Sequence, residues 1–147
     1  MSLDDWLKNS WLTAHQTSKR EIQDLLGVVD RDLGDCQAQG LSADWRLNIA
    51  YNAALQLATA ALAAAGFRAN RDAHHFRVFQ SLEHTVGADS ALIDQCEAFR
   101  KKRNLGHYER AGMISDQEAE DMVRLAKRLR KEVEVWLRAN HPKLLKK

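Results

Sequence analysis

Residues that break helices are scarce in this chain of 147 residues. The only proline, Pro142, lies close to the C-terminal end, and seven glycines are spread over the rest. No segment shows the alternation of β-branched and polar residues that is typical of a half-buried strand. Long stretches rich in alanine, leucine, glutamate and arginine favour helix instead. We therefore predict an all-α protein without a substantial sheet.

Cysteine is also rare, since Cys36 and Cys96 are the only two and neither belongs to a metal-binding motif. We predict that both are small buried hydrophobic residues in a reducing compartment, without a disulfide or a zinc site. His74 and His75 are adjacent, and neighbouring residues on a helix point about 100° apart, so they do not chelate one ion together. We expect a structural role for His75, and neither a metal nor another cofactor.

Long apolar runs are absent as well. No stretch of about 18 apolar residues is present, which is the length that crosses a membrane. The chain starts Met1-Ser2-Leu3-Asp4-Asp5, and this acidic start is unlike the basic start of a signal peptide. We expect a cytoplasmic protein that does not enter a membrane.

Charge is distributed unevenly along the chain. Residues 1–96 carry 8 Lys and Arg against 12 Asp and Glu, whereas residues 97–147 carry 14 against 8. The last third is therefore basic, although the formal net charge of the chain is only +2. A basic region favours a polyanionic partner, although a solvated C-terminal helix has the same composition.

The helical periodicity predicts a single domain over residues 1–147. Four main helices joined by short loops form an up-and-down antiparallel bundle over 17–140, with a short N-terminal amphipathic helix within 1–16 and a basic tail at 141–147. The expected helices cover 3–13, about 18–39, 43–65, 73–86, a segment through 92–107 and a long last stretch from 115. Their apolar faces predict these buried residues: Leu25, Leu26, Val29, Ile49, Ala53, Leu57, Phe79, Leu82, Cys96, Phe99, Leu125, Leu129 and Val133.

The predicted helix over 43–65 is apolar nearly all the way round, which is typical of the central helix of a bundle. One narrow polar strip remains, formed by Asn48, Asn52, Gln56 and Thr59. We expect this strip to face water. The alternative is that it lines a cleft beside the polar residues of the helix through 92–107.

That helix changes character along one face. Leu92, Ile93, Cys96 and Phe99 form an apolar stripe, and the next residues in the same direction are Arg100, Arg103, Asn104 and His107, which we call the Arg–His seam. Burying these cations unpaired would cost several kcal/mol. Either an anion meets the seam, or the helix end is solvated or paired with a carboxylate such as that of Glu97 or Glu109.

Several segments resemble the HEPN domains of prokaryotes over about residues 40–137. These are the alanine-rich stretch Ala50–Ala58, the loop that leads to His74-His75, and Arg100-Lys101-Lys102-Arg103-Asn104 followed by His107-Tyr108. The signature of the family is an Arg, four to six residues, then a His. Six residues separate Arg100 from His107, which fits, whereas only three separate Arg103 from His107, although Arg103 forms the Arg-Asn pair of the family with Asn104.

The resemblance implies a protein that handles RNA or nucleotides, including metal-independent ribonucleases of toxin–antitoxin and defence systems that act as homodimers. It implies His107 as the catalytic acid or base and Arg100 or Arg103 as the phosphate clamp. We also expect RNA contacts from four further side chains: Asn104, Tyr108, Lys101 and Arg128.

The alternative is a non-catalytic helical interaction module. HEPN families include inactive partners of minimal nucleotidyltransferases, so the resemblance also implies a nucleotidyltransferase or an antitoxin as partner. Such a module would bind through the exposed face of the last helix or through Trp6 and Trp11.

Overall fold

The structure is a computed structural model that describes residues 1–71, 74–108 and 114–145, with side-chain surroundings described for all of these except 104–108. Two short strands, β1 (Leu12–Ala14) and β2 (Phe67–Ala69), and 3₁₀ turns at Ser81–Glu83 and Pro142–Leu144 accompany the helices. The helices are α1 (Leu3–Lys8), α2 (Lys19–Asp35), α3 (Ala43–Ala64), α4 (His74–Gln80), α5 (Ser90–Tyr108) and α6 (Asp116–Asn140).

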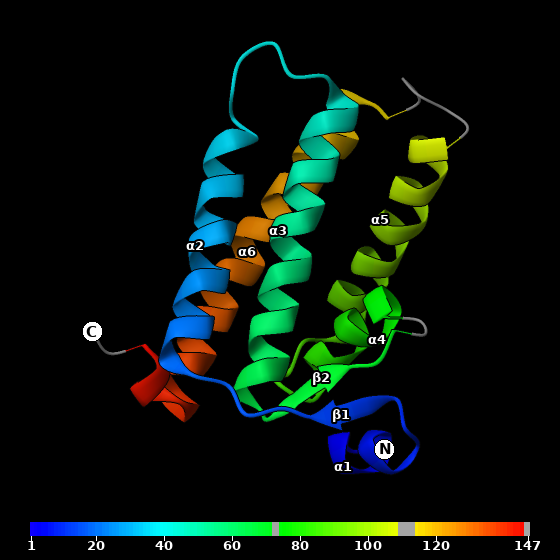
Figure 1. The fold of residues 1–147 in the computed structure, drawn as a ribbon. Helices are drawn as coiled ribbons and strands as arrows, with labels where there is room; N and C mark the ends of the chain where they lie inside the picture. The colour runs from blue at the N-terminus through cyan, green and yellow to red at the C-terminus, as the bar shows by residue number, and fades with distance from the viewer. Residues whose placement is uncertain (72–73, 109–113, 146–147) are drawn as a thin grey trace.

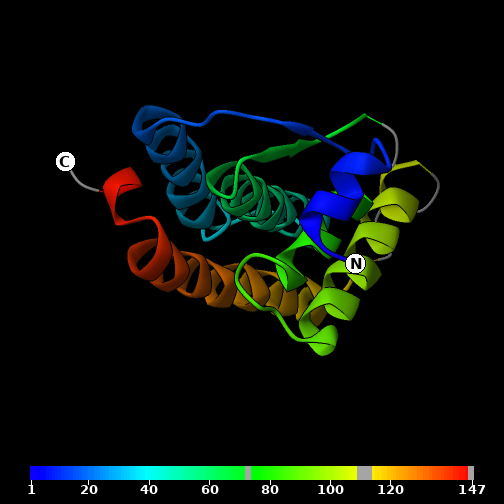
Figure 2. The same cartoon turned by 90° about the horizontal axis from the view of Figure 1, so that it is seen from below.

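The four long helices α2, α3, α5 and α6 run antiparallel to their neighbours in chain order (Figure 1). Viewed along the bundle, α3 lies between α2, α6 and α5, and the short helix α4 fills the space beside α5 (Figure 2). The predicted all-α up-and-down bundle is therefore confirmed. Serine side chains cap the starts of α3 and α6, where Ser42 accepts the backbone N–H of Trp45 and Ser115 that of Glu118.

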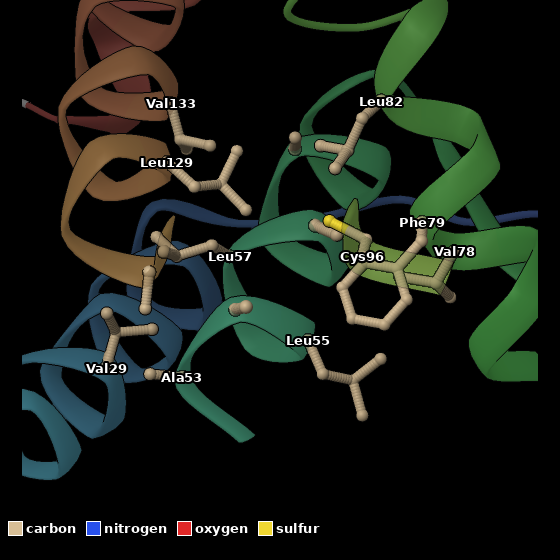
Figure 3. Packing of buried hydrophobic residues seen from close by; sticks show 14 of the residues in the cluster. Val29, Ala53, Leu55, Leu57, Val78, Phe79, Leu82, Cys96, Leu129 and Val133 are labelled. Carbon is tan, nitrogen blue, oxygen red and sulfur yellow. The ribbon is translucent and has the colours of Figure 1, made fainter. Parts of the chain in front are cut away.

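The core is built around α3. On one side, Leu57 lies near Leu129 and Val133 of α6 and Val29 of α2, and on the other Phe79 of α4 lies near Cys96 of α5 (Figure 3). Of the thirteen predicted core residues, ten are buried, and Leu25, Ile49 and Phe99 are half-buried and pack against the core. Helical periodicity was sufficient here because the outer helices each have one apolar face and α3 is apolar nearly all the way round.

Helix α3 is, among the described residues, the one helix long and apolar enough to cross a membrane by length and composition. Of its most apolar window, 72% is buried inside the protein. This burial is what a central helix of a bundle requires, since its apolar surface is covered by α2, α6 and α4.

The prediction that the polar strip on α3 faces water was wrong. All four of its residues are half-buried, so the strip does not simply face water. Asn52 donates through Nδ2 to Oδ2 of the buried Asp32 on α2 at 2.7 Å. The strip therefore faces α2 at this point, and not the helix that carries the Arg–His seam.

The N-terminal segment also differs from the prediction. Helix α1 ends at Lys8, and Leu12–Ala14 then pairs antiparallel with Phe67–Ala69, with Leu12 opposite Ala69. Gly66, with a φ of 100°, makes the turn from α3 into β2. Strands of three residues are too short to show alternation, and their pairing depends on a partner more than fifty residues away.

Candidate nucleic-acid interface

Helices α3, α4 and α5 meet around the described part of the Arg–His seam. We call the side chains that gather there the arginine cluster. Its members are Tyr51 from α3, His75 and Phe76 from α4, and Glu97, Arg100 and Arg103 from α5. Arg100 and Arg103 lie on the same side of α5 because three residues make nearly one helical turn, with Arg100 near the Phe76 ring and Arg103 near the Tyr51 ring.

Arg100 is paired within its own helix. Its Nε donates to Oε1 of Glu97 at 3.1 Å and its Nη2 donates to Oε2 at 3.1 Å. The side chains of Arg100 and Glu97 are 25% and 15% exposed, and the Arg100 guanidinium carbon lies 5.9 Å from the centre of the Phe76 ring. The hydrogen bonds with Glu97 raise the pKa of Arg100, so this guanidinium is held as one half of an ion pair.

Arg103 has a different environment. Its guanidinium carbon lies 4.9 Å from the centre of the Tyr51 ring, which is cation–π distance. The residue is half-buried, and within the described ranges no carboxylate lies within ion-pair distance of it. Arg103 therefore has an aromatic surface beneath it and no described counter-charge.

Tyr51 and His75 form a hydrogen bond between α3 and α4. The Tyr51 hydroxyl lies 3.1 Å from Nδ1 of His75. Burial raises the pKa of Tyr51 to about 12, so the hydroxyl is protonated at neutral pH. The tautomer of His75 sets which of the two groups donates. Burial also lowers the pKa of His75, and the positive charge of Arg103 lowers it further. The structural role expected for His75 is confirmed.

Two further predicted RNA contacts, Lys101 and Arg128, lie on different helices. Lys101 is exposed on α5, and Lys102 beside it forms an ion pair with Glu118 of α6. Arg128 lies on α6, where its Nε donates to Glu132 at 3.2 Å. Arg128 therefore does not belong to the arginine cluster.

Arg128 instead lines a groove of about 580 Å³ between α5 and α6. The floor of this groove is apolar, and Ala98, Phe99 and Leu125 contribute to it. Charged side chains at the rim include Lys102 and Arg128. The bundle is thus open between α5 and α6, on a different face of α5 from the arginine cluster.

Three predicted site residues lie in the last turn or so of α5. The helix continues without a break to Tyr108, so it includes Asn104 and His107. The side chains of Asn104, His107 and Tyr108 lie outside the described residues. In the described part of the chain, no group of His, Cys, Asp or Glu side chains is arranged to hold a metal ion.

Tyr51 and Phe76 were not among the residues predicted for the site. Tyr51 is the one large side chain with a polar tip within the alanine-rich stretch Ala50–Ala58, and a buried tyrosine hydroxyl needs a partner. That signal was sufficient to mark Tyr51 as unusual. Its partner on α4 could not be identified without the packing of the two helices.

Comparison with known proteins gives no further guide: no model of a known family, no curated protein and no solved structure matches this chain.

Proposed function

We propose that this protein handles RNA through the Arg–His seam, in the manner of HEPN ribonucleases, and cleaves it as a homodimer without a metal. The observation that supports this best is the environment of Arg103, a half-buried guanidinium that faces Tyr51 without a described carboxylate. Such a cation is ready to accept a phosphate. His107 follows four residues later in the same unbroken helix.

The chemistry needs only side chains of these types. RNA is cleaved by its own 2′-hydroxyl when a base removes the hydroxyl proton, an acid protonates the departing 5′-oxygen and a cation stabilises the phosphate. A histidine with an ordinary pKa near 6.5 serves as either base or acid at neutral pH. An arginine binds two phosphate oxygens at once. A two-fold dimer would supply a second copy of His107 and of each arginine.

The charge distribution supports an anionic ligand at this end of the chain. Residues 97–147 carry 14 basic and 8 acidic residues. Glu97 offsets the charge of Arg100, whereas Lys101 is exposed and Arg103 has no described counter-charge. The positive potential at the α5 surface therefore depends mainly on Lys101 and Arg103.

Three measurements on the wild-type chain test the proposal. We expect sedimentation at tens of micromolar protein to show a dimer. We expect RNA binding to weaken linearly with the logarithm of salt concentration. We expect cleavage of single-stranded or structured RNA to persist in EDTA, because no step uses a metal. A dimer that cleaves neither RNA would contradict the nuclease function.

The groove between α5 and α6 favours a second function. Its apolar floor at Ala98, Phe99 and Leu125 is suited to an amphipathic helix of another protein. A non-catalytic module that binds a nucleotidyltransferase or an antitoxin through this groove would leave RNA intact. Loss of partner binding in Phe99→Asp, with no ribonuclease activity in the wild-type dimer, would support this function over the first.

A further inference from the structure

The two arginines of the arginine cluster are held differently. We propose that Tyr51 and His75 are positioning residues that hold Arg103, and not Arg100, as the arginine that binds the phosphate of RNA. This inference rests on the proposed function, because the phosphate belongs to the RNA backbone. It separates two arginines that helical spacing alone leaves equivalent.

Arg100 is the poorer candidate because one bidentate edge of its guanidinium is already used. Glu97 accepts from both Nε and Nη2, which is one of the two pairs of donors that a phosphate could take. Both partners are at least three-quarters buried, so releasing Arg100 would leave the Glu97 carboxylate in a poorly solvated place without its cation. Arg100 therefore stabilises the end of α5 and contributes little free binding capacity.

Arg103 is held by an aromatic ring and not by a described carboxylate. Its guanidinium carbon lies over the Tyr51 ring, 4.9 Å from the ring centre, and a cation–π contact of this kind does not use a hydrogen-bond acceptor. Phosphate oxygens bind guanidinium along its edge, through the N–H donors. Contact with the Tyr51 ring is therefore compatible with phosphate binding, whereas the ion pair of Arg100 competes with it.

The Tyr51 ring is itself fixed in place. Its hydroxyl is bonded to Nδ1 of His75 at 3.1 Å, and its ring meets the ring of Phe79 edge-on at 5.5 Å. Only 1% of Tyr51 is exposed. A rigid surface under Arg103 limits the rotamers that this long side chain samples before RNA arrives, which reduces the entropy lost on binding.

The test is RNA binding by the full-length chain, measured by fluorescence anisotropy with a labelled single-stranded oligoribonucleotide from about 50 to 200 mM salt. Arg103→Gln and Arg100→Gln are compared, with Arg20→Gln, at an exposed arginine of α2 outside the arginine cluster, as the control. We expect Arg103→Gln to weaken binding about 10-fold and to reduce the salt slope by about one. We expect Arg100→Gln to leave the slope unchanged.

The positioning role is tested through Tyr51 and His75. Tyr51→Leu removes the ring surface, and we expect weaker RNA binding with a shallower salt slope. Tyr51→Phe keeps the ring and His75→Gln keeps a hydrogen-bond acceptor, so both should retain most of the affinity and report on the site if Tyr51→Leu unfolds. The double variant Tyr51→Leu with Arg103→Gln should bind no worse than Arg103→Gln alone, because Tyr51 acts through Arg103.

The outcomes distinguish this inference from the proposed function. A folded wild-type chain that binds no RNA overturns both. RNA binding that survives Arg103→Gln but is lost in Arg100→Gln overturns only the assignment of Arg103. Additive losses in the double variant overturn the positioning role, because Tyr51 would then act through the stability of the fold.

Discussion

The two sides of α3 carry out different tasks. Toward α2 and α6, α3 presents small and aliphatic residues such as Ala53 and Leu57, and both are fully buried. Toward α4 and α5, it presents Tyr51, whose ring and hydroxyl reach Arg103 and His75. Helix α3 therefore serves both as the centre of the core and as the support of the candidate interface.

This separation has a physical cause. Alanine side chains let neighbouring helices approach closely, so the α2–α3–α6 side is densely packed, and its buried Asp32 is hydrogen-bonded to Asn52. On the other side, Tyr51 brings a buried hydroxyl whose hydrogen-bond partner is His75, and its ring lies under Arg103. Substitutions on the two sides should therefore change different properties.

The largest expected effect is on activity, from His107→Ala. If His107 is the acid or base, its removal should lower the rate of RNA cleavage by 10²–10⁴-fold, about 2.7–5.4 kcal/mol in the transition state. Thermal unfolding should show that His107→Ala is as stable as the wild-type protein. Equal loss of activity after addition of EDTA to the wild type would contradict the metal-independent chemistry.

Leu57→Ala should affect stability on the opposite side of α3. Leu57 is fully buried, so we expect the free energy of unfolding to fall by about 2–5 kcal/mol. The matched control is Val135→Ala, at a residue that is 67% exposed, with a change within about 0.5 kcal/mol. Chemical denaturation measures both. Similar losses in the two variants would mean that the packing of α3 is not the main source of stability.

Asn52→Ala tests the polar contact on the core side of α3. It removes the Nδ2 donor from Oδ2 of Asp32, a residue that is only 5% exposed, and we expect a loss of about 1–3 kcal/mol in the free energy of unfolding. Asn48→Ala is the control, because Asn48 donates only to the backbone oxygen of Asp44 in its own helix. RNA binding should be the same in both variants.

The smallest effect should come from the pH dependence of stability at His75. Its pKa in the folded protein lies below the ordinary value of 6.5, so the unfolded chain binds more protons in this range. The contribution of neutral His75 to stability is therefore present above pH 6.5 and is lost as the pH falls toward the folded pKa. Denaturation of wild type and His75→Gln at pH 7 and pH 5.5 should show the difference between them shrinking. A constant difference would mean that His75 titrates equally in both states.

Much of the fold followed from local pattern. The helix over 43–65 was predicted almost to the residue, because apolar and capping signals coincide there. The segment at 73–86 was not, since α4 ends at Gln80 and a 3₁₀ turn follows at Ser81–Glu83. The β1–β2 pair could not be predicted, because its strands are three residues long and adjoin only in the folded chain.

The candidate interface was predictable only in part. The positions of Arg100 and Arg103 on one face of α5 follow from 3.6 residues per turn. Spacing alone does not show that Glu97 pairs with Arg100 while Tyr51 faces Arg103. The contact of Arg103 with Tyr51 joins residues from two helices. Arg128, expected to contact RNA beside them, lies instead in the α5–α6 groove.

The helices, their apolar faces and the position of the basic residues along α5 follow from the sequence alone, because these depend on residues within a few turns of one another. The packing of the helices shows in addition that Asn52 bonds to Asp32, that a groove lies between α5 and α6, and that Tyr51 lies under Arg103. Those contacts join residues distant in the chain, and they are set by how whole helices pack against α3.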